Sequence, residues 1–324
     1  MLTTTVGNYP KIGGKAPNLR AAKNRLDRGE TSPEEVARIA DEVTKEVLQE
    51  QIDAGVDLVT DGQIRWDDGQ TYFARGMTGF SIKGLTRYFD NNTYYRQPVV
   101  EGKIGWSSPI STDHFTFASG NSSKPVKAIL TGPYSLGRLS VLEAGYEGLG
   151  PLVLDLAEAL NNEALALQKA GASIIQFDEP CILRHPEDID LFLEASERVV
   201  RGLTVKTAVY TYFADASKVA DGLLRSPFLI IGLDFASSDG NWQVVEKFPA
   251  DKELGFGIVN GRNTGLETAD QIAQACQRVM QHVPQDRLYV NPNSGLEYLP
   301  REKAQQKLER LVEGVNKARE VVRA

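Results

Sequence analysis

The stretch SIIQFDEP, residues 173–180, is a short, mainly apolar run that ends in two carboxylates and a proline. Its paired isoleucines and its phenylalanine favour an extended backbone. Because the run is apolar almost throughout, both faces of the strand should be covered, as they are in parallel sheets. The segment therefore predicts a buried parallel strand with polar side chains at its carboxyl end.

Seven further runs of this kind alternate along the chain with longer segments of helical periodicity. The eight predicted strands cover residues 3–9, 57–61, 127–131, 173–178, 206–212, 228–234, 254–260 and 288–291. This alternation predicts an α/β fold, a single (β/α)8 TIM barrel that forms one domain over residues 1–324. A doubly wound open sheet is the alternative, but no GxGxxG sequence follows the first predicted strand.

The predicted helices have recognisable start signals. Ser32 is a predicted N-cap, Pro33 takes the first helical position, and Glu35 is placed to complete a capping box. This helix should continue through Gly55. Similar apolar spacing predicts helices over residues 151–170, 186–201, 216–224, 268–282 and 301–322.

Residues 80–117 interrupt the alternation of strands and helices. They are rich in Tyr, Thr, Val and Gly and include the turn-like sequence DNN at residues 90–92. We predict a β-hairpin excursion between the second and third barrel strands, and such excursions often form a wall of an active site.

The composition of the 324-residue chain restricts its class. A hydrophobic content of 41% suffices for a large core, and a formal charge of −7 without a long basic run argues against a nucleic-acid partner. No apolar stretch approaches the roughly 18 residues of a membrane-spanning helix, and the N-terminal residues do not resemble a signal peptide. We therefore expect a cytoplasmic protein without a membrane partner. Cys181 and Cys276 match no CxxC spacing, which argues against a disulfide framework.

The candidate functional residues follow the predicted strands, because the active site of a (β/α)8 barrel lies at the carboxyl ends of its strands. In chain order these ends carry residues 7–10, 61–65, 131–134, 176–180, 210–212, 234, 260–262 and 291–296. So many polar groups at one end of a barrel favour a functional site over a purely structural role.

Each candidate also has a structural interpretation. Residues 178–180 are able to cap the following helix, and Tyr210 and Tyr212 are able to fill the barrel interior as packing. Arg65 has neighbouring aspartates with which to pair. Three histidines lie away from the strand ends and are expected to be structural or solvated: His114, His185 and His282.

Taken in order, the strand ends resemble the catalytic barrel of the cobalamin-independent methionine synthase family, in its short single-barrel form. The resemblance covers essentially the whole chain. In that family a zinc ion held by a histidine, two cysteines and a glutamate binds homocysteine as its thiolate, and a methylated folate supplies the methyl group. The motifs that carry the resemblance are TTVGNYP (4–10), DGQIRWDD (61–68), LTGP (130–133), IQFDEP (175–180) and VNPNSGL (290–296).

The resemblance also implies where the zinc ligands would fall. Tyr210 matches the histidine, Tyr212 and Ser294 match the cysteines, and Asp234 matches the glutamate, so none of the four positions keeps the family's residue. Zinc prefers thiolate and imidazole ligands. We therefore predict no metal ligands, no catalytic zinc and no tightly bound cofactor. Ferric iron is an alternative that would require deprotonated tyrosines.

The amino-acid pocket implied by the resemblance is changed as well. Gln63 takes the place of a glutamate that helps to hold the substrate ammonium group, whereas the aspartate Asp178 remains. Loss of one carboxylate weakens recognition of an ammonium group and therefore weakens the case for homocysteine as the acceptor. The predicted substrate-binding residues are Gly7, Asn8, Gln63, Arg65, Glu179, Asn291 and Ser294.

We predict a methyltransferase that moves a methyl group from a methylated folate or a methylcorrinoid to a small acceptor. Tyr210 and Tyr212 would orient or protonate the substrate, and Asp178 or Asp234 would act as general base. A protein that delivers the methyl donor is a further expected partner. The alternatives are a carbon–sulfur lyase or elimination enzyme and a non-catalytic ligand-binding barrel. Cys181 is a candidate nucleophile, or a buried thiol that behaves as a small hydrophobe.

Overall fold

The computed structural model describes residues 1–91 and 93–323 and has an α/β fold with a seven-stranded parallel sheet and a separate three-stranded sheet. The chain divides into two compact units. The first unit comprises Met1–Arg65, Thr116–Lys127 and the stretch from Leu233 onward, and the second comprises Trp66–Phe115 and Ala128–Gly232. Two elements contribute residues to both units: α4 (Thr112–Gly120) and β8 (Ile230–Asp234).

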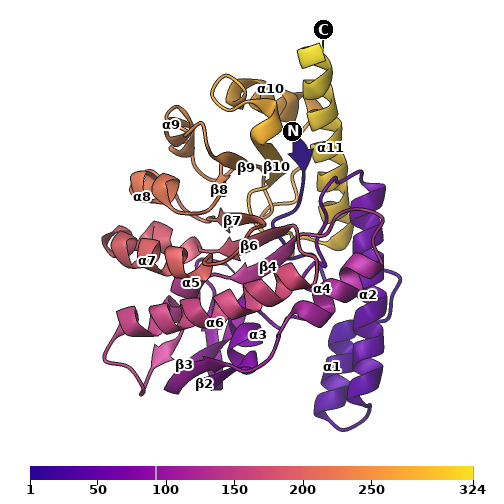
Figure 1. The fold of residues 1–324 in the computed structure, drawn as a ribbon. Helices are drawn as coiled ribbons and strands as arrows, with labels where there is room; N and C mark the ends of the chain where they lie inside the picture. Colours follow the sequence, from indigo (N-terminus) through magenta and orange to yellow (C-terminus); the bar gives the residue numbers. More distant parts are fainter. Residues whose placement is uncertain (92, 324) are drawn as a thin grey trace. The chain divides into compact units, whose positions relative to one another are not determined.

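In the first unit, parallel strands pair in the order β1, β10 and β9. Helices α1 and α2 lie side by side along the N-terminal part of this unit (Figure 1). The elements of the first unit are β1 (Leu2–Thr3), α1 (Leu19–Asp27), α2 (Pro33–Asp53), α9 (Asn241–Val245), β9 (Glu253–Val259), α10 (Ala269–Val279), the 3₁₀ helix η3 (Gln285–Arg287), β10 (Leu288–Pro292) and α11 (Arg301–Arg323).

The start of α2 agrees with the sequence in one respect and differs in another. The Ser32 side chain accepts a hydrogen bond from the Glu35 backbone N–H, and Pro33 follows at the first helical position, as predicted. The predicted capping box is wrong, because the Glu35 carboxylate binds Arg38 at 2.7 Å. A complete capping box lies instead at α10, between Thr268 and Gln271.

Among the residues that the structure describes, the predicted second strand, residues 57–61, makes two isolated parallel bridges, Thr4 with Leu58 and Val59 with Val126. Its regular pairing stops at Thr60, whose backbone N–H and C=O both bond to the Gln51 side chain of α2, at 3.0 and 2.8 Å. At Thr60 a buried side-chain amide thus takes the place of a neighbouring strand as the backbone's partner.

In the second unit, parallel strands pair in the order β4, β6, β7 and the beginning of β8. The stretch that predicted this sheet forms β6, and Ile174 to Phe177 are buried. The elements are α3 (Gly69–Gly76), β2 (Met77–Arg87), β3 (Tyr94–Trp106), β4 (Ala128–Thr131), α5 (Pro133–Arg138), β5 (Val141–Leu142), α6 (Leu149–Lys169), β6 (Ile174–Asp178), the 3₁₀ helices η1 (Pro180–Arg184) and η2 (Pro186–Asp188), α7 (Ile189–Val199), β7 (Lys206–Tyr210) and α8 (Ala220–Arg225).

The region for which the sequence predicts an excursion contains two long antiparallel strands, β2 and β3 (Figure 1). Strand β3 also pairs with β5. The strands begin before residue 80, at Met77, and the predicted end at 117 lies inside helix α4. Glu163 of α6 is buried, and its carboxylate accepts hydrogen bonds of 2.7–2.8 Å from Trp106, Ile110 and Ser111. One carboxylate therefore fixes the segment that leaves β3. Among the described residues, no helix combines the length and apolarity needed to cross a bilayer.

Candidate functional site

Asp178 stands at the carboxyl end of β6 in the second unit, and both of its carboxylate oxygens have partners. Gln176 donates from Nε2 to Oδ1 at 2.7 Å, and the Tyr212 hydroxyl donates to Oδ2 at 3.4 Å. Asp178 also lies opposite Tyr210 in the β6–β7 register. The structure thus brings together three of the four predicted catalytic residues within one unit.

The two tyrosines have different surroundings. Tyr210 ends β7, and its ring covers Gly232 so closely that a Cβ added there would lie 2.5 Å from the ring. Tyr212 follows outside the strand, and its ring meets Phe213 edge to face with centroids 4.6 Å apart. Phe213 has a φ of 72°, a conformation that is strained for a bulky residue. The positive φ of Phe213 thus accompanies the edge-to-face packing of the Tyr212 and Phe213 rings after β7.

Glu179 is buried beside Asp178 but has a structural partner. Its two oxygens accept hydrogen bonds from the backbone N–H groups of Tyr134 and Ser135, at 2.9 and 2.7 Å. These groups belong to the first turn of α5, so the carboxylate caps that helix and not the one that follows it. Burial raises the pKa of Glu179 to about 7, although these hydrogen bonds oppose the shift.

In the first unit, Asp234 is buried at the end of β8 and shapes the loop that follows it. Its Oδ1 accepts hydrogen bonds from the backbone N–H groups of Ala236 and Ser237, at 3.1 and 2.9 Å. Asn293 donates to the same oxygen at 2.9 Å and accepts from the Gly261 N–H at 2.8 Å. Asn293 therefore ties the loops after β8, β9 and β10 together, a role that its place between two predicted residues did not reveal.

The predicted residues next to Asn293 are also engaged within the first unit. The Asn291 Nδ2 donates to the Pro292 carbonyl at 2.7 Å. The Ser294 hydroxyl is fully buried and lies 3.4 Å from both the Asn293 Oδ1 and the Gly295 carbonyl. These contacts hold the loop after β10 in place.

Arg65 is a predicted substrate-binding residue that the structure places in an ion pair. Its guanidinium binds Asp41 of α2 and lies 5.5 Å from the centroid of the Phe117 ring. The partner is thus a residue of a distant helix and not an aspartate next to it in sequence. A ligand would have to compete with Asp41 for this guanidinium.

The remaining predicted residues of the first unit meet at the loop after β1. The Gly7 carbonyl accepts a hydrogen bond from the Thr60 hydroxyl at 3.0 Å. The Asn8 carbonyl accepts from the Leu296 N–H at 2.8 Å. Gln63 is buried with a φ of 52°, and its backbone N–H donates to Asp61 Oδ1 at 2.9 Å.

Sequence reasoning missed Glu297, which follows the VNPNSGL motif. A Cβ added to Gly295 would lie 2.1 Å from the Glu297 Oε2, so the carboxyl group folds back over this glycine. Burial raises the pKa of Glu297 to about 7. The only sequence signal was an acidic residue close behind a strand-end motif.

The donor atoms at the four positions that resemble zinc ligands do not suit zinc. In the first unit, Asp234 Oδ1 already accepts three hydrogen bonds and the Ser294 hydroxyl is a neutral group in a closed loop. In the second unit, Tyr210 and Tyr212 offer phenols. Zinc sites use thiolate, imidazole and carboxylate ligands, so this set of residues does not fit the ion.

Both cysteines and two of the histidines, His114 and His185, lie in structural environments. Cys181 and Cys276 are buried, and burial raises the pKa of each thiol to about 12. His114 bonds to the Tyr72 hydroxyl, and His185 to Arg138. Burial with a raised pKa favours the interpretation of Cys181 as a small hydrophobe.

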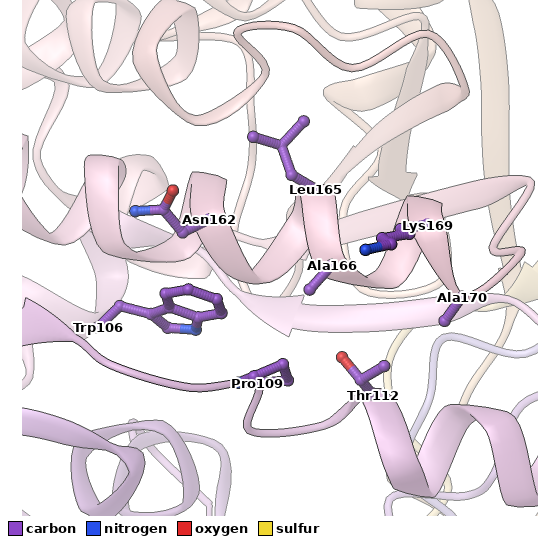
Figure 2. A pocket seen from close by; sticks show the side chains of 8 residues that line it. All are labelled: Trp106, Pro109, Thr112, Asn162, Leu165, Ala166, Lys169 and Ala170. Atoms are coloured by element: carbon purple, nitrogen blue, oxygen red, sulfur yellow. The ribbon is translucent and has the colours of Figure 1, made fainter.

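A groove of about 520 Å³ lies in the second unit between α6 and the segment that leaves β3 (Figure 2). None of the predicted site residues lines it. Its lining residues are Trp106, Pro109, Thr112, Asn162, Leu165, Ala166, Lys169 and Ala170.

Carboxylate, amide and phenol groups at the carboxyl ends of parallel strands are the arrangement typical of α/β enzymes. The chain belongs to the cobalamin-independent synthase family, because the model of that family's catalytic domain matches residues 1–317. Membership of this family, together with its relatives, makes the chain a methyltransferase.

The relatives cover nearly the whole chain. The methionine synthase of Saccharolobus solfataricus is 34% identical over 322 residues, which are 98% of this chain and 95% of that protein. The methionine synthase of Sulfurisphaera tokodaii is 32% identical over 324 residues, or 98% and 92% of the two chains. A B12-independent methionine synthase from Shewanella sp. W3-18-1, solved in complex with selenomethionine, has a TM-score of 0.87 at 23% identity and covers 99% of this chain and 98% of that one. At that identity the structural likeness establishes the fold alone.

Proposed function

We propose that this chain is a cytoplasmic, single-domain (β/α)8 barrel, with the β2–β3 hairpin as an excursion, that transfers a methyl group to a small acceptor without catalytic zinc. The donor is a methylated folate or a methylcorrinoid, and a corrinoid donor implies a partner protein that delivers it. Names of the relatives support the reaction class, and the donor atoms at the zinc-ligand positions support a zinc-independent reaction.

The observation that carries the proposal is the fixed carboxylate of Asp178. Gln176 and Tyr212 hold its two oxygens at the carboxyl end of a parallel strand, where barrel enzymes place their chemistry. We assign the general base to Asp178 and not to Asp234, because Asp234 Oδ1 already accepts three hydrogen bonds.

The proposed step balances without a zinc ion. The acceptor loses a proton to the Asp178 carboxylate, and the electron pair left on the acceptor atom forms the bond to the methyl carbon. The bond between the methyl carbon and the donor breaks, and its electron pair stays on the donor. The Tyr212 hydroxyl, which donates to Asp178, keeps the carboxylate oriented toward the acceptor.

The test follows a labelled methyl group from methylated folate or methylcobalamin to a panel of small thiols, amines and hydroxyl compounds. We expect a labelled acceptor, and Asp178→Asn should lower kcat/KM by about 10²- to 10⁴-fold, the usual contribution of a general base. Asp190→Asn, which removes an exposed carboxylate of α7 in the same unit, should leave the rate unchanged. Consumption of an acceptor without movement of the label would instead indicate elimination, and saturable binding without turnover would indicate a ligand-binding homologue.

A further inference from the structure

The tip of the β2–β3 hairpin and the loop after β7 meet through aromatic rings of the second unit. The centroid of the Phe213 ring lies 5.6 Å from that of Phe89 and 6.1 Å from that of Tyr88. The Phe213 ring also meets the Tyr212 ring edge to face at 4.6 Å. Phe213 therefore links the tip of the hairpin to Tyr212, whose hydroxyl donates to Asp178.

The same tip contacts η1, the segment that follows Asp178 and Glu179 in the chain. Asp90 pairs with Arg184 of η1 at 2.5 Å, and the Arg184 guanidinium carbon lies 4.8 Å from the centroid of the Phe89 ring. The Asp90 side chain is 78% exposed, so this ion pair contributes at most about 1 kcal/mol. The contacts of the aromatic rings are therefore the stronger link between the tip and the segments next to Asp178.

Both phenylalanines of this contact have positive backbone φ angles, 50° at Phe89 and 72° at Phe213. This conformation costs a residue with a bulky side chain on the order of 1–3 kcal/mol, whereas glycine adopts it freely. A turn or loop that needed only this backbone shape would favour glycine or asparagine at the two positions. Phenylalanine at both positions therefore indicates that the rings themselves have a role.

The position of the Tyr212 hydroxyl depends on contacts outside the sheet. Tyr212 follows the end of β7, where Thr211 donates from its N–H to the Gly232 carbonyl of β8 at 3.0 Å. The Tyr212 ring is buried, and the 3.4 Å from its hydroxyl to Asp178 Oδ2 is longer than most hydrogen bonds of this kind. A small movement of the ring would therefore break this bond, and the Phe213 ring opposes such a movement.

We propose that Phe213 and Phe89 are positioning residues for the general base: the contact between their rings holds the Tyr212 hydroxyl against Asp178. This inference rests on the proposed function and deepens it, because it gives the hairpin a part in the reaction. Neither phenylalanine touches the acceptor in this scheme. Loss of their contact should therefore slow the chemical step through Asp178 and leave binding of the acceptor as it is.

The first measurement is methyl transfer by Phe89→Ala, which removes a ring of the hairpin tip without altering Tyr212 or Asp178. We expect kcat to fall about 10- to 100-fold with an unchanged KM for the acceptor, as misplacement of a catalytic group does. Phe89→Tyr keeps the ring and should keep the rate. Leu85→Ala, at an exposed side chain of the same hairpin, should also keep the rate and is the control for general effects on the hairpin.

A double-mutant cycle tests whether the effect passes through the Tyr212 hydroxyl. Tyr212→Phe alone should lower kcat by a similar factor, and Phe89→Ala should cause little further loss in that background, because both substitutions remove the same contact. An equal loss of rate in the two backgrounds would overturn the inference, and so would an unchanged kcat in Phe89→Ala.

Carbon-13 NMR of protein labelled at its aspartate carboxyl carbons reads the same contact without a methyl donor, and Asp178→Asn assigns the signal. In variants with an unchanged circular dichroism spectrum, Tyr212→Phe and Phe89→Ala should shift the Asp178 signal in the same direction, and Phe89→Tyr should leave it in place. A signal that stays in place in either of the first two variants would overturn the inference. Absence of methyl transfer by the unaltered protein would reject the proposed function, and the Asp178 signal would still decide the inference.

Discussion

At the scale of single residues, Glu179 shows how burial alters a carboxyl group that also has good partners. Burial raises its pKa from the ordinary value of 4.5 to about 7, while hydrogen bonds from Ser135 and Tyr134 act in the opposite direction. Folding therefore favours the protonated form. The contribution of this group to stability is complete below the unfolded-state pKa and is lost as the pH rises through about 7.

The first prediction concerns this pH dependence. Glu179→Gln removes the titration. As the pH rises from about 5 to about 8, the free energy of unfolding of the unaltered protein should therefore fall relative to that of the variant. The change should approach about 3 kcal/mol, since one pKa unit corresponds to about 1.4 kcal/mol. Urea unfolding at the two pH values measures it. A difference that stays constant across this range would mean that Glu179 does not titrate there.

The sequence predicted Glu179 as a site residue from its neighbours, but its role depends on a helix far away in the chain. A cap for the helix that follows it was foreseeable, whereas a cap for α5 was not, because the residues of α5 lie more than forty positions earlier. Glu297 was missed for a related reason. An acidic residue after a turn usually faces solvent, and only the burial of Oε2 without a donor distinguishes it.

At the scale of elements, the start of α5 depends on the small size of Gly132. This residue precedes the helix, and its N–H donates to the Asp178 carbonyl at 2.9 Å. A Cβ at this position would lie 2.2 Å from the Glu179 carboxyl carbon. Any side chain would therefore displace the carboxylate that caps α5.

Gly132→Ala should accordingly lower the free energy of unfolding by about 2 kcal/mol or more, because overpacking and loss of the cap act together. Thermal and urea unfolding measure the loss. Gly84→Ala is the matched control, since a Cβ added in this exposed part of β2 would contact nothing within 4 Å. Equal stability of the two variants would show that the Glu179 carboxyl group moves aside at little cost.

The end of the β2–β3 hairpin is held by contacts with the loop after β7 and with the 3₁₀ helix η1. The Phe89 and Phe213 rings lie 5.6 Å apart, and Arg184 pairs with Asp90 at 2.5 Å and covers the Phe89 ring. Both phenylalanines have positive φ values, 50° and 72°. Two strained residues thus face each other across this contact.

Phe213→Ala should free the end of the hairpin while the parallel strands stay protected, because the ring contacts disappear and the core does not. Hydrogen–deuterium exchange should increase in peptides that cover the end of β2 and the beginning of β3. Leu85→Ala, at a side chain that is 66% exposed on the same hairpin, should leave exchange as it is. Unchanged exchange in Phe213→Ala would mean that the hydrogen bonds between β2 and β3, and not the ring contacts, keep the end of the hairpin ordered.

At the scale of the whole molecule, the strands buried on both faces were predictable and the polar segments between them were less so. The SIIQFD run forms β6 as predicted, because its apolar side chains require a buried environment. The strand begins one residue later than predicted, at Ile174. Residues 57–61 have a similar pattern, yet the Gln51 side chain occupies both backbone groups of Thr60. A competing partner from a helix is not visible in the local pattern of a strand.

Protein purified without chelators should contain far less than one zinc per chain, because the four positions that resemble zinc ligands carry phenols, a hydroxyl and a hydrogen-bonded aspartate. Elemental mass spectrometry measures the content. Prolonged dialysis against a chelator should leave methyl transfer at its original rate. One zinc per chain, lost on dialysis together with activity, would mean that other side chains bind the ion and that the reaction depends on it.

The two cysteines give the molecule a property that bears on the conditions in which it works. Both are buried and both thiols have a pKa of about 12, so almost no thiolate exists near neutral pH. Peroxides and electrophiles attack thiolates and spare thiols. Both cysteines of the chain are therefore poor targets for these reagents while the protein stays folded.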